Sequence, residues 1–127
     1  MIRHGGQALV ESLLGLGARK AFGVPGESFL AVLDALHDTV GRFDFVNCRN
    51  EGGAGFMAAA WGKLTGEPGI AFVTRGPGAT NASIGVHTAM QDSAPMILFV
   101  GQVATDMKGR EAFQEIDYRA AFGPIAK

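Results

Sequence analysis

Glu51 is the side chain of this sequence whose surroundings most strongly suggest acid–base chemistry. An apolar run at residues 42–48 predicts a strand before it, and apolar residues spaced three and four apart after it predict a helix. Glu51 therefore lies at the connection between the end of a strand and the start of a helix. Parallel α/β sheets bind ligands beyond the carboxyl ends of their strands, where such connections lie. The same position suits a purely structural helix-start acid favoured by the helix dipole. Position alone leaves both interpretations open.

The elements that must position Glu51 alternate between helix-like and strand-like segments with short turns. This order is typical of βαβ units and a parallel sheet. Helices are predicted at residues 6–17, 29–36, 51–65 and 82–89, and strands at residues 21–24, 42–48, 70–73 and 96–100. Residues 74–81 are predicted to turn into the last helix, 103–112 to form an exposed loop, and 113–127 to be less regular. We predict an α/β protein with three layers and a mainly parallel central sheet.

Parallel strands would bring the segments that follow them to one edge of the sheet. These segments are Pro25-Gly26, Asn50-Glu51, Thr74 to Gly78 and Gly101-Gln102. Their glycines would let a ligand approach the backbone closely, and Glu51 is their only carboxylate. The opposite edge has ordinary turn residues, such as Gly41 and the cluster at 66–69. We therefore expect the site at the glycine-lined edge.

Length and composition allow one domain with a real core, since the 127 residues are 47% hydrophobic and 18% charged. The net charge of −1 gives no electrostatic case for binding nucleic acid or an anionic membrane surface. Cys48 is the single cysteine, which excludes an internal disulfide and fits a reducing compartment. No apolar run has membrane-spanning length, and the first residues do not resemble a signal peptide. We expect a cytoplasmic protein with neither nucleic-acid nor membrane partners.

Several common motifs do not fit this sequence. Gly76-Pro77-Gly78 begins like a dinucleotide-binding turn, but Asn81 stands where the third glycine is required. The chain has no Gly-Lys-Ser or Gly-Lys-Thr of a P-loop and no G-x-S-x-G elbow. Its histidines are scattered and Cys48 has no companion ligand, so no metal site is predicted within the chain.

A series of short blocks instead points to one family. In chain order they are Gly23-Val24-Pro25-Gly26, Arg49 to Ala54, Gly66 to Gly69, Thr74 to Asn81, Gln91 to Met96, Gly101-Gln102 and Ala112 to Glu115. As a set they resemble the N-terminal pyrimidine-binding domain of thiamine diphosphate enzymes, and most of all that of acetolactate synthase large subunits. The resemblance covers nearly the whole chain and implies a flavodoxin-like fold.

The resemblance implies a catalytic role for Glu51. In that family the matching glutamate hydrogen-bonds N1′ of the cofactor's aminopyrimidine ring, and a carboxyl in a poorly solvated crevice can share a proton with a ring nitrogen. The resulting imino tautomer takes the proton from thiazolium C2. The ylid attacks a 2-keto acid, and the cofactor then serves as an electron sink.

Further site residues follow from the same matching. They are Pro25, Gly26, Thr74, Pro77 and Asn81 on the cofactor side, and Phe113 and Gln114 on the substrate side. Some of them have a structural alternative: a strand-ending turn at 25–26, a helix cap for Asn81, and a core position for Phe113.

Two departures from the family pattern bear on substrate choice. Acetolactate synthases usually have His and Gln flanking the glutamate, where this chain has Asn50 and Gly52. They also usually have Gly-Gly after the proline, where this chain has Gly26-Glu27. Carboligation, decarboxylation and lyase outcomes therefore remain open, as does a non-catalytic flavodoxin-like binding module.

The family binds the cofactor diphosphate through Mg²⁺ on a separate C-terminal domain, marked by Gly-Asp-Gly and Asn-Asn, and neither motif occurs here. Residues 1–127 are expected to form an incomplete pyrimidine-binding domain that lacks its closing helix and strand and is inactive alone. Active sites in the family form between the pyrimidine domain of one subunit and the diphosphate domain of another, which implies a homodimer or homotetramer. Any FAD site lies outside this stretch.

Overall fold

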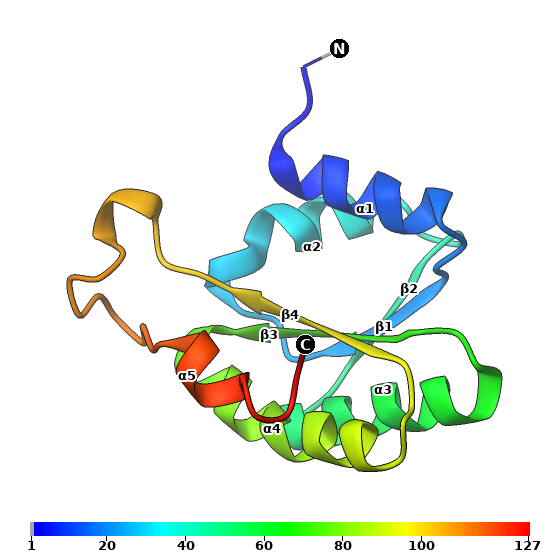
Figure 1. Ribbon diagram of the computed structural model, residues 1–127. Helices are drawn as coiled ribbons and strands as arrows, with labels where there is room; N and C mark the ends of the chain where they lie inside the picture. The colour runs from blue at the N-terminus through cyan, green and yellow to red at the C-terminus, as the bar shows by residue number, and fades with distance from the viewer. Residues whose placement is uncertain (1) are drawn as a thin grey trace.

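The computed structural model describes residues 2–127 and contains one sheet of four parallel strands (Figure 1). The strands are β1 (Lys20–Gly23), β2 (Asp44–Asn47), β3 (Gly69–Thr74) and β4 (Met96–Gly101), in the order β2-β1-β3-β4. The helices are α1 (Gly5–Gly15), α2 (Leu30–His37), α3 (Glu51–Thr65), α4 (Arg75–Gln91) and α5 (Tyr118–Phe122). Short 3-10 turns, η1 (Glu27–Phe29) and η2 (Thr105–Met107), lie in the connecting segments.

Helices cover both faces of the sheet, which confirms the predicted three-layer α/β fold. Figure 1 shows α1 and α2 on one face and α3 and α4 on the other. Under α1 and α2, aromatic rings fill the core: Phe72 on β3 stacks on Phe99 at 4.8 Å and lies 6.0 Å from Phe29. Under α3 the core combines small residues, among them Ala54 and Ala58, with the buried ring of Phe22.

Small residues also let α3 and α4 pack closely against each other. A Cβ added at Gly85 of α4 would lie 2.4 Å from the carbonyl carbon of Gly55 of α3, so the two backbones meet at this point. The crossing brings the first turns of the two helices together at the carboxyl edge of the sheet. That edge is where the predicted site lies.

The start of α4 differs from the sequence prediction. The predicted turn at residues 74–81 is wrong, because the helix begins at Arg75 and Thr74 is its N-cap. Pro77 is tolerated there because the N–H groups of the first helical turn have no partner within the helix. The glycines that suggested a turn are required by packing: a Cβ at Gly76 would lie 2.7 Å from the carbonyl oxygen of Gln114.

The remaining elements agree with the sequence prediction to within a few residues at their ends. Residues 113–127, expected to be less regular, contain only the short α5. Within residues 2–127, no helix is both long and apolar enough to cross a membrane.

Candidate functional site

The parallel strands place the predicted segments at one edge, as expected from their order. β1 pairs with β2 on one side and with β3 on the other, so the chain reverses its winding between β1 and β3. This switch point is the usual ligand crevice of such sheets. The loop after β1 touches the end of β3 there: a Cβ at Gly26 would lie 2.5 Å from the Cβ of Thr74. The hydroxyls of Ser28 and Thr74 are 2.7 Å apart.

Glu51 and Asn81 meet at the same edge. Glu51 is the first residue of α3, where the side chain of the N-cap Asn50 accepts the Gly52 N–H at 2.8 Å. The Asn81 amide donates to Glu51 Oε2 at 2.9 Å. Since Asn81 lies in the second turn of α4, its alternative role as a helix cap is wrong. Its amide instead orients the carboxylate across the two helices.

The other carboxylate oxygen of Glu51 faces the glycines. Oε1 lies 3.4 Å from the position that a Cβ of Gly78 would occupy, so it lies against a residue that presents no side chain. No group within residues 2–127 donates a hydrogen bond to Oε1. The Glu51 side chain is only partly buried, so these residues do not complete the dry crevice expected from the sequence.

The segment predicted to lie on the substrate side, which contains Phe113 and Gln114, reaches the same edge from the chain after β4. Phe113 is 71% exposed, so its alternative as a core residue is wrong. The Gln114 carbonyl accepts the Gly76 N–H at 2.8 Å, which fixes the segment to the start of α4. Of the remaining cofactor-side candidates, Pro25 and Pro77 are both exposed at this edge.

One ion pair at the edge was missed by sequence reasoning. Arg75 Nη1 donates to Glu27 Oε1 at 2.9 Å, joining the loop after β1 to the start of α4. One indication was present in the sequence: Glu27 is a charged residue at a position where the family that this chain resembles usually has glycine. Sequence reasoning could not identify its partner, because the two residues are 48 positions apart.

Tyr118 packs against a buried cluster formed by Val73 of β3 and by Ala79 and Ala82 of α4. Burial raises the pKa of the Tyr118 phenol above its ordinary value of 10.0, with Arg75 acting in the opposite direction and Glu115 in the same one. Its hydroxyl is buried, and no hydrogen-bond partner for it exists in the described chain. The phenol is therefore a neutral packing group with an unsatisfied polar atom.

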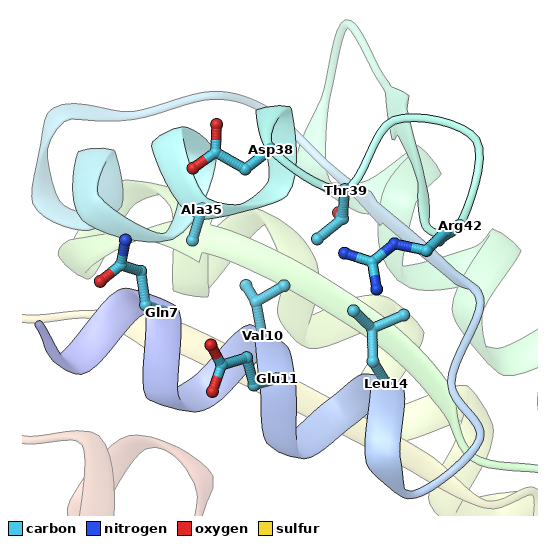
Figure 2. A pocket seen from close by; sticks show the side chains of 8 residues that line it. All are labelled: Gln7, Val10, Glu11, Leu14, Ala35, Asp38, Thr39 and Arg42. Carbon is cyan, nitrogen blue, oxygen red and sulfur yellow. The ribbon is translucent and has the colours of Figure 1, made fainter. Parts of the chain in front are cut away.

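Two hollows lie away from the predicted site residues. Figure 2 shows one between α1 and α2, of about 290 Å³, with Val10 and Ala35 in its wall and Glu11, Asp38 and Arg42 among its polar lining. The other, of about 950 Å³, runs beside the exposed edge of β4 and the C-terminal segment. None of the predicted site residues lines either hollow. Across residues 2–127, no three His, Cys, Asp or Glu side chains are grouped so that they could hold a metal ion.

Comparisons with known proteins place this chain in one family over nearly its whole length. Residues 3–121 match the family model described as "Thiamine pyrophosphate enzyme, N-terminal TPP binding domain". The chain is 46% identical over 123 residues to the acetolactate synthase isozyme 3 large subunit of Escherichia coli, covering 97% of this chain and 21% of that protein. It is 41% identical to the mitochondrial acetolactate synthase catalytic subunit of Aspergillus candidus, over 98% of this chain and 18% of that protein.

A third relative is the probable acetolactate synthase large subunit of Methanocaldococcus jannaschii. It is 41% identical over 97% of this chain and 20% of its own length. The chain thus spans about a fifth of the length of these relatives.

Proposed function

Because this chain belongs to the thiamine pyrophosphate enzymes, as their N-terminal TPP binding domain, we propose that it supplies the proton-transferring carboxylate of an acetolactate synthase-like enzyme. Its substrates are 2-keto acids, and Glu51 is the catalytic residue. The observation that supports this most directly is the Glu51 carboxylate held by Asn81 at the glycine-lined edge. The names of the relatives supply the reaction class.

The residues at this edge fit an aminopyrimidine ring. Glu51 Oε1 offers an acceptor without a donor among residues 2–127, and Gly78 presents no side chain to it. We assign Pro25, Gly26, Thr74 and Pro77 to the surface that holds the ring. When bound, thiamine diphosphate supplies the nucleophilic carbon and the electron sink for bond breaking next to a keto group.

The chain's own residues then perform two tasks. Glu51 would hold or release a proton at Oε1 toward a nitrogen of the bound pyrimidine ring, which would make it the acid–base group of the site. Asn81 fixes the carboxylate rotamer through Oε2, which leaves Oε1 on the side of Gly78 to accept from the ring. The start of α3 adds a favourable helix-dipole interaction with the carboxylate.

A second subunit is proposed to cover the site. Phe56 and Met57 on α3 and Ile84 on α4 are 46%, 38% and 53% exposed. Apolar groups exposed in this way on neighbouring helices are typical of a protein interface. We assign this surface to the diphosphate-binding domain of another subunit in a homodimer or homotetramer. That domain would hold Mg²⁺ and exclude water from Glu51.

Substrate and outcome are proposed from the residues that flank the site. Phe113 presents an exposed ring beside the start of α4 and is assigned, with Gln114, to the substrate side. A related thiamine diphosphate decarboxylase or lyase is the second candidate, favoured by Asn50 and Gly52 where acetolactate synthases usually have His and Gln. The lone Cys48 fits action in the reducing cytoplasm.

The decisive experiment replaces Glu51 by Gln in the full-length enzyme. Glutamine keeps the shape and still accepts from Asn81, but it does not exchange a proton, so turnover of pyruvate should fall by about 10²- to 10³-fold. The control is Glu67→Gln, an exposed acid in the turn at the opposite edge of the sheet. Circular dichroism and thermal unfolding should be unchanged in both variants. Normal turnover in Glu51→Gln would remove the proposed role.

A further inference from the structure

Arg75 occupies an unusual backbone position. It is the first residue of α4 and has φ of +33°, a left-handed conformation that non-glycine residues rarely adopt. Strained conformations of this kind persist where the surrounding structure holds them, and they cluster at functional sites. The Arg75 side chain is only 15% exposed, so its guanidinium is held within the structure.

The Arg75 guanidinium contacts two segments that are distant in sequence. Nη1 donates to Glu27 Oε1 at 2.9 Å and to the Phe113 carbonyl oxygen at 3.5 Å. Glu27 begins η1, directly after the cofactor-side turn at 25–26. Phe113 belongs to the substrate-side segment. One nitrogen atom therefore links the two sides of the proposed site.

The substrate-side segment is a defined turn that such a link can hold as a unit. The Glu115 carboxylate accepts the N–H groups of Gly109 at 2.7 Å and Ala112 at 3.3 Å. The Gln114 carbonyl accepts the Gly76 N–H at 2.8 Å, next to Arg75. Gln114 also has a left-handed φ of +65°. Two non-glycine residues in rare conformations thus lie at the same junction.

We propose that Arg75 is a positioning residue that fixes the substrate-side turn at 112–115 against the cofactor-side loop at 25–27 through its contacts with Glu27 and Phe113. This inference rests on the function proposed above. Arginine suits the role because its planar group presents several donors in fixed directions, which an ammonium group does not. Glu27 is 68% exposed, so the ion pair contributes geometry more than stability.

The first test measures pyruvate kinetics in the full-length enzyme. Arg75→Gln and Glu27→Gln should each raise KM about fivefold with a smaller change in kcat, and the double variant should be no worse than either single one. Arg75→Lys should restore part of the loss. The control is Lys63→Ala, which breaks a 2.8 Å ion pair with Asp92 at the far ends of α3 and α4 and should leave KM unchanged.

The second test needs neither cofactor nor substrate. Amide hydrogen exchange of Gly76 and residues 112–116 should be about fivefold faster in Arg75→Gln and Glu27→Gln than in the wild-type enzyme. Because Glu27 is exposed, its variant should fold normally. Arg75→Gly relaxes the left-handed backbone but lacks the guanidinium, so it should behave like Arg75→Gln. Wild-type exchange and KM in the glycine variant would overturn the proposal.

The outcomes separate this inference from the proposed function. Normal turnover in Glu51→Gln removes the acid–base role, whatever the Arg75 variants do. Loss of turnover in Glu51→Gln, together with wild-type KM and exchange in the Arg75 and Glu27 variants, overturns only the positioning role. Faster exchange without a higher KM also overturns it, because the turn would then move without consequence for the substrate.

Discussion

At the scale of single residues, the geometry of Glu51 depends on a partner 30 positions away. A carboxylate at the first position of a helix is common and usually structural. The Glu51 carboxylate differs from such a carboxylate because Oε2 accepts a hydrogen bond from Asn81 while Oε1 lies beside Gly78, which has no side chain. The side chain therefore has a defined direction, which a surface carboxylate generally lacks.

The titration of Tyr118 tests whether its phenol is buried against α4. The folded chain holds the phenol proton more tightly than the unfolded chain, because burial raises the pKa of Tyr118 above 10.0. Above that pH the unfolded chain loses the proton first, so the free energy of unfolding should fall as the pH rises from 10.0 through the folded pKa. Tyr118→Phe should lack this contribution to the pH dependence.

At neutral pH the same substitution should be neutral or stabilising by up to about 1 kcal/mol, since it removes a buried hydroxyl that has no partner in the described chain. Urea unfolding of the two proteins at neutral and alkaline pH measures both effects. An identical loss of stability at high pH in the phenylalanine variant would show that Tyr118 does not titrate as argued.

At the scale of elements, the crossing of α3 and α4 places Glu51 against Asn81. Gly85→Ala should therefore be destabilising by about 1–3 kcal/mol, because its Cβ would overlap the backbone at Gly55 and push the helices apart. Chemical denaturation measures this loss.

Gly53→Ala is the matched control on α3. A Cβ at Gly53 meets no atom within 4 Å, so the variant should be equally stable or gain up to about 1 kcal/mol from helix propensity. Equal effects at both positions would mean that the helices do not depend on close backbone contact.

At the scale of the whole molecule, the proposed site is open on one side. Glu51 is partly exposed and the apolar residues of α3 and α4 beside it face outward. We expect this chain by itself to show no turnover and to bind thiamine diphosphate poorly, because we assign the surface that would enclose the ring and hold the diphosphate to another domain.

Isothermal titration of residues 1–127 with thiamine diphosphate and Mg²⁺ measures this expectation directly. The full-length enzyme under the same conditions is the positive control. Micromolar binding by the 127-residue chain would contradict the proposal that a second domain completes the site.

Sequence patterns were sufficient for the fold and for the placement of the candidate segments at one edge of the sheet. Strand-like runs of continuous apolar residues at 70–73 and 96–100 predict buried parallel strands, and their order with the helices predicts the layers. Because parallel strands all end at the same edge of the sheet, the segments that follow them can be placed at that edge without any further information. Glu51 and the glycines around it followed from this geometry and from the family blocks.

Only the tertiary structure decided the contacts between segments far apart in the chain. Gly76-Pro77-Gly78 has the local chemistry of a turn, yet it forms the first turn of α4, where Gly76 leaves room for the backbone at Gln114. The Asn81–Glu51 hydrogen bond and the Arg75–Glu27 ion pair likewise join residues 30 and 48 positions apart. Local propensity is set by neighbours in sequence, whereas these pairings exist only after helix crossing and sheet formation have brought the segments together.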